Sequence, residues 1–362
     1  MREKPGPGFD RAQGPTHPAK AGLEHGGQII GRETMKFTTA LLLASGLGLA
    51  AVQAATIDDH VFAAHKAAGL DYPGTFARVC IQPPNSGDAL ASARRTAGAA
   101  AAPQPPRPTP ARDAWYAEPG HPFDNLYWLG SKVHNSWALK TSAGIVIIDT
   151  LYNYASETEI VGGMKKLGLN PADINYVIVT HGHGDHDEGA RLLQDKFGAH
   201  VVMGTADWDA IAKAGNMPGG VPKRDIAVSA DQKLTVGDTT ISIITTPGHT
   251  PGTLSMIFPV KDHGKTITVA YNGGTAFNFP RTPANFDIYI ASQKKFAAAA
   301  KAAGAVALIS NHTEFDGAFY KARIARAAGD TSPFVVGSDT VQRYFTVTSE
   351  CAEAAKMRLK GS

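Results

Sequence analysis

The sequence predicts an α/β fold in which two mixed β-sheets pack together and helices cover their outer faces. Two observations indicate this fold. From Trp115 onward, short runs rich in β-branched residues, closed by Gly, Asp, Thr or Pro, occur together with stretches of helical periodicity. In each half, hairpin-like strands come first and strands that alternate with helices follow, which favours two mixed sheets. We expect one such domain, at residues 113–362.

Each expected element follows from its local pattern. The expected strands are NLYWLG, HNSWALKTS, GIVIIDT, YVIVTH, HVVMGT, TTISIITTPG, TLSMIFPV, KTITVAY and VALIS. Helical periods cover residues 155–168, 188–198, 205–214, 285–303 and 316–328. Ahead of the domain, residues 58–70 predict a helix with an acidic start and a Gly stop, and an Ala/Pro-rich linker follows. Residues 55–112 are therefore expected to form an N-terminal helical segment and linker.

The N-terminus predicts export. Residues 1–34 are rich in Gly, Pro and charge and show no apolar period, so we expect a disordered extension or a misplaced start ahead of Met35. Residues 35–54 have one Lys, an apolar run and small residues at the end, which predicts a signal peptide cleaved after Ala54. The run is short for a membrane span, which needs about 20 apolar residues, although a retained anchor is the alternative. We expect a periplasmic or secreted protein that leaves the membrane after cleavage.

Composition and charge indicate which kinds of molecule the protein is expected to bind. Hydrophobic residues make up 43% and charged residues 19% of the 362 residues, as in a soluble globular protein. The net charge is +3, and Lys and Arg are scattered, so there is no basic stripe of the kind that binds nucleic acid. We expect a small-molecule substrate and a monomer, with an oligomer left open.

The only two cysteines, Cys80 and Cys351, lie outside any C-x-x-C motif. In an oxidising compartment they favour one disulfide, which would join the N-terminal segment to the C-terminal helix. By loop entropy such a bond would stabilise the fold by about 4 kcal/mol or somewhat more. Two unpaired buried thiols are the alternative, since spacing along the chain does not give distance.

A cluster of metal-seeking side chains follows one expected buried strand. In VIVTHGHGDHDEGA, His181, His183, Asp185 and His186 occupy the loop that leaves the strand. In layered α/β folds this edge of the sheet is where sites gather, and the glycines in the loop let several side chains turn toward one point. Imidazole with carboxylate suits zinc, and other borderline metals less decisively.

Two further histidines follow other expected strands. His249 lies in TPGHTPGT and His312 in SNHTEFD, each directly behind a β-rich run. Five histidines and one aspartate are enough for two zinc ions with three protein ligands each. Each metal would then keep an open position, as catalytic zinc sites do.

The order THGHGDH, TPGHTPGT, SNHTEFD resembles the metallo-β-lactamase superfamily, and the resemblance extends from Trp115 to the C-terminus. It implies the αββα sandwich, in agreement with the two-sheet prediction. The stretch NLYWLGSKVHNSWALKTSAGIVIIDT resembles the family's opening strands, whose Asp, here Asp149, supports the site from behind the ligands.

Particular positions distinguish the branches of this superfamily. Di-iron oxygen reductases carry Glu where this chain has His183. Glyoxalase II and tRNA-processing nucleases carry a bridging Asp, and the commonest β-lactamases a zinc-ligating Cys, where YNGGTAF has Gly274. The remaining pattern is similar to the third subclass of metallo-β-lactamases, including a His-x-x-x-x-Asp pattern from His312 to Asp316.

The resemblance implies a ligand set and a reaction. The first zinc would be bound by His181, His183 and His249, and the second by Asp185, His186 and His312. Zinc lowers the pKa of bound water to about 7, so a zinc-bound hydroxide would open the β-lactam amide. Asp185 would orient this hydroxide and could take up its proton, which makes Asp185 the expected catalytic residue.

The chain also departs from the subclass, which usually has a Ser near position 274. Asn272, Thr275 and Asn278 are the nearest polar candidates for substrate binding, and satisfying loop backbone groups is the alternative. Asp187 and Glu188 follow the motif, where their charge would discourage a carboxylate-bearing substrate unless they simply face solvent.

Some residues outside the motifs have two interpretations. Trp208, Tyr152 and Tyr154 are expected either to line the mouth of a cleft or to pack in the core. The other histidines are expected to be ordinary polar residues, although His134 directly precedes the strands that lead to Asp149. The ordinary polar histidines are His60, His65, His121, His134, His200 and His263.

Three functions remain. The first is an exported zinc β-lactamase, which would give antibiotic resistance. The second is a related exported zinc hydrolase that acts on lactones, esters or other amides with at most weak β-lactamase activity. The third, a non-catalytic binding module, is disfavoured because binding alone would not require six intact ligands.

Overall fold

The structure is a computed structural model that describes residues 55–81, 108–324 and 329–359. The expected extension and signal peptide at residues 1–54 and most of the linker lie outside the described residues. The described residues from Thr56 onward belong to one compact unit. The boundary expected at residue 113 stays a prediction.

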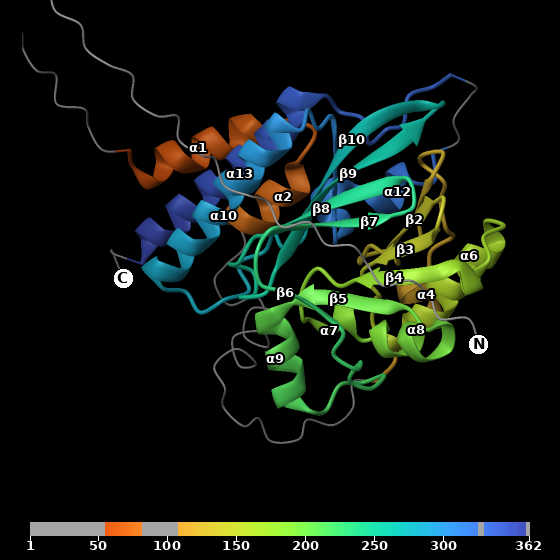
Figure 1. The fold of residues 1–362 in the computed structure, drawn as a ribbon. Coiled ribbons are helices and arrows are strands. Elements are labelled where there is room, and N and C mark those ends of the chain that lie inside the picture. Colours follow the sequence, from red (N-terminus) through yellow and green to blue (C-terminus); the bar gives the residue numbers. More distant parts are fainter. Residues whose placement is uncertain (1–54, 82–107, 325–328, 360–362) are drawn as a thin grey trace, which may run out of the picture. The chain divides into compact units, whose positions relative to one another are not determined.

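Two mixed sheets form the centre of this unit, as the sequence predicts (Figure 1). The six-stranded sheet contains, in spatial order, β1(Leu126–Trp128), β2(Trp137–Thr141), β3(Gly144–Ile148), β4(Ile174–Ile178), β5(His200–Gly204) and β6(Ile226–Val228). Its first three strands are antiparallel, and β3 to β6 are parallel. The five-stranded sheet has the order β11(Ala307–Ser310), β10(Lys265–Asn272), β9(Leu254–Asp262), β8(Thr239–Thr245) and β7(Gln232–Val236), and only β10 and β11 are parallel.

Three apolar clusters hold the layers together. The central cluster takes side chains from both sheets, among them Trp128, Trp137 and Phe258, all with at most 1% of their surface exposed. A second cluster packs α1(Ile57–Ala68), α10(Pro283–Ala302) and α13(Ser338–Arg358) against the five-stranded sheet. A third packs α5(Asn153–Ser156), η2(Glu157–Gly162), α6(Gly163–Lys166), α8(Ala190–Phe197) and α9(Thr205–Ala214) against the six-stranded sheet. The αββα layering is therefore confirmed.

Several elements differ from the prediction. The helix expected at residues 316–328 is wrong as one element, because Gly317 adopts a left-handed conformation with φ 74° between α11(Thr313–Asp316) and α12(Ala318–Lys321). Residues 325–328 lie outside the described part. The sequence also missed β6 and β7, since one has only three residues and the other alternates with polar side chains. The remaining short helices are α2(Pro73–Phe76), η1(Ala77–Ile81), α4(Arg112–Trp115), η3(Pro171–Asp173) and α7(Gly184–Asp187).

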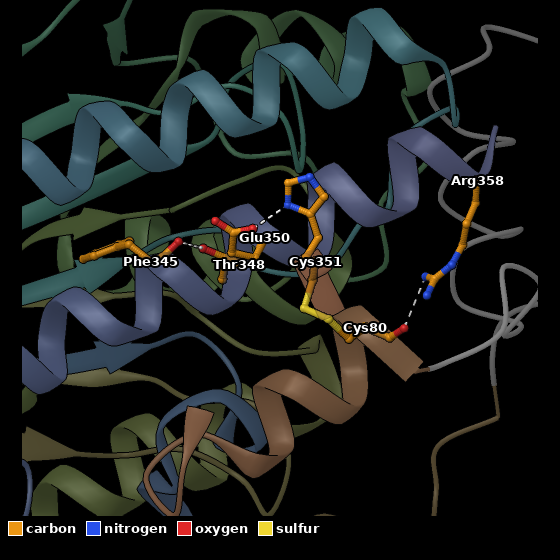
Figure 2. Close-up of a disulfide and its surroundings, with 7 residues drawn as sticks. Cys80, Phe345, Thr348, Glu350, Cys351 and Arg358 are labelled. Carbon is orange, nitrogen blue, oxygen red and sulfur yellow. Dashed lines mark hydrogen bonds and ion pairs between the residues drawn. A yellow bond between two sulfur atoms is a disulfide. The ribbon is translucent and has the colours of Figure 1, made fainter. Parts of the chain in front are cut away.

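The N-terminal segment packs on the C-terminal helix and is joined to it by a disulfide. Cys80 in η1 and Cys351 in α13 form this bond across a Cα–Cα distance of 4.9 Å, so the alternative of two unpaired thiols does not hold (Figure 2). The Arg358 guanidinium donates to the Cys80 carbonyl at 3.4 Å. Among the described residues, no helix has the length and apolar character to cross a membrane.

Candidate metal centre

Loops at the ends of strands bring the expected ligands together. His181 and His183 lie between β4 and α7, a short helix that begins at Gly184 and contains Asp185 and His186. His249 lies in the loop between β8 and β9, and His312 directly follows β11. Segments far apart in the sequence thus supply side chains to one place, as expected for the strand ends of an α/β fold.

Three imidazoles form the first half of the centre. Nε2 of His249 lies 3.1 Å from Nε2 of His181 and 3.1 Å from Nδ1 of His183. The rings are buried, with exposed fractions of 0% for His181, 8% for His183 and 4% for His249. These atoms meet the spacing of a three-ligand metal group.

The hydrogen bonds of two rings show that a cation fits between them. Nδ1 of His181 faces the Gly273 carbonyl at 2.9 Å, and Nδ1 of His249 faces the Ala276 carbonyl at 2.7 Å. A carbonyl only accepts, so each Nδ1 carries the proton and each Nε2 presents a lone pair. Burial lowers the pKa of His181 well below its usual value and that of His249 to about 4, so both rings are neutral. Two lone pairs 3.1 Å apart repel each other unless a metal ion accepts both.

The second half of the centre contains a carboxylate. Oδ2 of Asp185 lies 3.2 Å from Nε2 of His312 and 3.3 Å from Nε2 of His186, and these two nitrogens are 3.1 Å apart. Burial opposes the charge of Asp185, but the neighbouring histidines hold its pKa well below the usual value. Burial also opposes the charge of His186, but Asp185 and Asp149 raise its pKa to about 10. The two halves adjoin, since the His181 and His186 rings lie 4.4 Å apart.

Asp149 supports this arrangement from behind. It is fully buried, with a left-handed φ of 61°, and its carboxylate lies 3.1 Å from Nδ1 of His186. The same carboxylate accepts hydrogen bonds from the Thr180 amide at 2.8 Å, the Thr180 hydroxyl at 2.9 Å and the Tyr271 hydroxyl at 3.0 Å. One carboxylate therefore fixes the loop after β4, strand β10 and a ligand ring.

The geometry agrees with what similar proteins show. Residues 129–264 match the family model described as the metallo-beta-lactamase superfamily. This part of the chain resembles a metallo-β-lactamase domain. BJP-1, a subclass B3 metallo-beta-lactamase of Bradyrhizobium japonicum, is 29% identical over 68% of this chain and 96% of its own, with a TM-score of 0.55. The metallo-beta-lactamase GOB-18 from Elizabethkingia meningoseptica, 20% identical with a TM-score of 0.58, covers 73% of this chain and 100% of its own and shows the shared fold.

The curated relatives carry another name. The hydroxyacylglutathione hydrolase of Acidiphilium cryptum is 29% identical over 202 residues, which are 51% of this chain and 76% of that protein. The hydroxyacylglutathione hydrolase of Brucella ovis is 30% identical, but the match spans only 29% of this chain and 34% of that protein. The chain is thus a hydrolase of the metallo-β-lactamase fold with candidate metal-binding groups, and it resembles subclass B3 in structure.

Sequence reasoning missed Asp207 in α9 as a residue that supports the candidate metal centre. Its buried carboxylate accepts from the amides of Gly182 at 2.8 Å and Gly252 at 3.0 Å and from the Thr250 hydroxyl at 2.7 Å. Asp207 therefore joins the loop of His181 and His183 to the loop of His249. No pattern in the sequence indicates this role, because the contact joins segments about 25 to 45 positions apart.

His134 also differs from the expectation of an ordinary polar histidine. Its Nε2 lies 3.5 Å from Oδ2 of Asp185, and these atoms form a metal-type group with His312. The rings of His134 and Tyr152 are T-shaped to each other with their centroids 5.1 Å apart, and Tyr152 stacks on Tyr154. Tyr152 therefore lies beside the centre, whereas Trp208 is buried in the core and donates to the Ile226 carbonyl at 3.0 Å.

The candidates for substrate binding lie in a buried network. Asn272 and Thr275 have at most 1% exposure, and Nδ2 of Asn272 donates to the Thr275 hydroxyl at 3.0 Å and to the Tyr344 hydroxyl at 3.2 Å. This network favours the alternative to substrate binding, in which these side chains satisfy polar groups of the loop. Asn278 is half-buried, and its main-chain amide donates to the Ala276 carbonyl at 3.0 Å. Substrate contact by these residues stays a prediction.

Two acidic residues beside the centre are buried. The idea that Asp187 and Glu188 face solvent is wrong, since they are 2% and 6% exposed. Glu188 accepts from the Asn153 amide at 3.2 Å. Burial raises the pKa of Asp187 well above its usual value, which favours the neutral form and weakens its expected repulsion of a carboxylate substrate.

Proposed function

We propose that this chain is an exported zinc β-lactamase, which opens the β-lactam amide with two zinc ions. The observation that supports this most is the pair of adjoining ligand groups, with His186 turned toward Asp185 and His312. Gly274 adds neither a carboxylate nor a thiol, and a Cβ there would lie only 2.5 Å from the Cβ of His249. The likeness to BJP-1 supports the same branch.

Within this proposal, His181, His183 and His249 hold one zinc ion, and Asp185, His186 and His312 hold the other. Bound zinc would lower the pKa of water from 15.7 to about 7 and polarise the substrate carbonyl. His181 and His249 donate their Nδ1 protons to main-chain carbonyls, so their rings are fixed in orientation. They therefore serve as neutral ligands and supply no proton.

Asp185 is the group in this centre that can move a proton. Its side chain is 15% exposed, whereas that of Asp149 is fully buried and already accepts three hydrogen bonds. Asp185 accepts the proton of the attacking water as oxygen bonds to the carbonyl carbon. The C–N bond then breaks, and the proton passes to the departing nitrogen, which completes the hydrolysis.

The second candidate is a related zinc hydrolase that acts on an ester, thioester, lactone or other amide. The curated relatives favour it, since both proteins described above are called hydroxyacylglutathione hydrolases. Gly274 argues against the bridging-aspartate arrangement of glyoxalase II, because the position offers no carboxylate and no room for one without a shift of His249.

We propose export on the basis of residues 35–54, whose apolar run and small C-terminal residues fit a signal peptide. The disulfide between Cys80 and Cys351 supports an oxidising compartment. Fractionation of cells that express the whole chain, with N-terminal sequencing of the exported form, tests this. A protein that starts at Ala55 in the periplasm is expected, and an uncleaved cytosolic protein would contradict export.

One assay distinguishes the two hydrolase functions. The exported chain is purified with zinc, its zinc content is measured, and hydrolysis of a chromogenic cephalosporin is followed with and without a chelator. A hydroxyacylglutathione, a lactone and an ester are tested in parallel, with His249→Ala as the inactive control. Two zinc ions and rapid, chelator-sensitive cephalosporin turnover are expected. Two zinc ions with turnover of another substrate only would favour the second candidate, and no bound metal would exclude both.

A further inference from the structure

His134 is held beside the second half of the centre by the main chain. The segment around it is bonded to the segment of His312: the Asn135 amide donates to the Asn311 carbonyl at 2.8 Å, and the Thr313 amide donates to the Val133 carbonyl at 2.9 Å. His134 and His312 form an antiparallel bridge pair between these bonds. The position of His134 is thus tied to that of an expected ligand.

A turn and a buried amide fix this segment further. The hydroxyl of Ser131 accepts from the His134 amide at 3.0 Å, and the Ser131 amide donates to the His134 carbonyl at 2.8 Å. The side chain of Asn135 donates to the Ser310 carbonyl at 2.9 Å and contacts the buried Asp316 carboxylate. The backbone that carries His134 is therefore held on both sides by hydrogen bonds.

The imidazole of His134 points at the atoms that would hold the second metal. Its Nε2 lies 3.5 Å from Oδ2 of Asp185, and its ring centre lies 5.0 Å from that of His312. The side chains of His134 and His312 are both 19% exposed, so they border the open side of the centre, while His186 is buried behind them. The ligand atoms of His134, Asp185 and His312 all lie within 4.8 Å of one another.

We propose that His134 is a fourth protein ligand of the second metal, with Asp185, His186 and His312. This inference rests on the proposed two-metal function. Atoms bound at 2.0–2.1 Å to a tetrahedral zinc lie about 3.3 Å from one another. The distances from Oδ2 of Asp185 to the three imidazole nitrogens are 3.2, 3.3 and 3.5 Å, which match this spacing.

The extra ligand gives the two metals different roles. A zinc ion with four protein ligands has the closed coordination of structural sites, whereas three ligands leave an open position. The first metal, with only His181, His183 and His249, keeps its open position for water. With His134, Asp185, His186 and His312 as its ligands, the second metal would have no open position and would supply mainly its charge.

The direct test is ¹⁵N NMR of histidine-labelled whole chain as exported, without metal and with one and two equivalents of zinc. We expect six imidazoles to shift on full loading, namely the five histidine ligands of the proposed function and His134. His134→Gln assigns the additional resonance. Five shifted imidazoles, with Nε2 of His134 unchanged, would overturn this inference while leaving the two-zinc function intact.

A second measurement uses the affinity for zinc. Competition with a chromophoric chelator gives the two dissociation constants, and His134→Gln is expected to raise that of the second zinc at least tenfold without changing the first. The matched control is His200→Gln, which breaks a 2.9 Å His–Asp pair at the start of β5, whereas the ligand loop follows the C-terminal end of the parallel strand β4, and it is expected to change neither constant. An unchanged second constant in His134→Gln would contradict the inference. A wild-type chain that binds fewer than two zinc ions would instead overturn the proposed function, and this inference with it.

Discussion

The two halves of the candidate centre use the same kind of side chain but are held in different ways. In the first half, the rings of His181 and His249 donate to main-chain carbonyls at 2.9 and 2.7 Å, and no carboxylate lies among the three ligands. In the second half, His186 lies between the carboxylates of Asp149 and Asp185 at 3.1 and 3.3 Å. The rings of His181 and His249 are neutral, whereas the His186 ring in the second half is paired with two carboxylates.

This difference decides what each half needs from a metal. The first half brings lone pairs together, so a bound cation relieves a repulsion that the protein alone does not compensate. The second half contains the ion pairs of His186 with Asp185 and Asp149, which stay favourable without metal. The fold thus places a site that depends on its metal beside one that is organised in advance.

The largest effect is expected from removing a ligand of the first half. His249→Ala should lower kcat/KM at least 10³-fold and remove one zinc, because losing a ligand costs more than losing an oxyanion donor, worth about 10²–10³ in kcat. Zinc content and steady-state kinetics measure it. His121→Ala, which changes an exposed ring stacked on Tyr127, is the control and should keep both zinc ions. An active His249→Ala with two zinc ions would remove the first half from the mechanism.

The next prediction tests whether the disulfide stabilises the whole fold without affecting zinc binding at the centre. Cys351→Ser opens a bond that spans 271 positions, and loop entropy predicts a loss of about 4 kcal/mol or more in the free energy of unfolding. Denaturant unfolding measures this loss. Because the bond joins η1 to α13, both zinc constants should stay unchanged under native conditions. If Cys351→Ser lost zinc from one half only, the disulfide would also be shown to shape the centre.

Two buried aspartates allow the halves to be weakened one at a time. Asp149→Asn removes the charge beside His186 and should weaken the second zinc about 10–100-fold, as is typical when a partner of a ligand is lost. Asp207→Asn replaces one of the two oxygens that accept from the Gly182 and Gly252 amides with an NH2 group, which cannot accept, and should weaken the first zinc by a similar factor. Chelator competition on both variants measures the constants. Equal weakening of both zinc ions in each variant would show that the halves act as one site.

The sequence predicted the fold well where its patterns are strong. Strands such as GIVIIDT and YVIVTH are continuous apolar runs, and they became β3 and β4. Prediction failed where the local signal is short or broken: β6 has three residues, and Gly317 ends a helix inside a helical period. The expected disulfide correctly joined the N-terminal segment to the C-terminal helix, but the packing of α1 over the five-stranded sheet was not predicted, because it depends on contacts between segments far apart in the chain.

Prediction of the candidate centre has the same limit, because contacts between distant segments do not show in the sequence. His181, His183, Asp185 and His186 stand together in one loop, so their convergence was predictable from the sequence. The roles of His134 and Asp207 were not, since each contacts the ligands through segments that only the tertiary structure brings together. Burial of Asp187 and Glu188 was also missed, because a charged pair after a motif is normally exposed.

The last contrast concerns the pH dependence of the stability of the metal-free protein, where the two halves should contribute with opposite signs. The pKa of His249 falls from 6.5 to about 4 on folding because its ring is buried. Between these values the unfolded chain binds a proton that the folded chain does not, so stability falls as pH is lowered from 6.5 to 4. Burial opposes the charge of His186, but its carboxylates raise the pKa from 6.5 to about 10, so its contribution is complete below 6.5 and is lost as pH rises toward 10.

Unfolding of the chelated protein across this pH range, compared with His249→Gln and His186→Gln, measures both contributions. Each histidine contributes a slope of at most about 1.4 kcal/mol per pH unit. His249→Gln should flatten the plot of unfolding free energy against pH on its acid side only. His186→Gln should flatten the same plot on its alkaline side only. If His249→Gln flattened neither side, its ring would already be charged in the metal-free protein, and the contrast between a neutral half and an ion-paired half would fail.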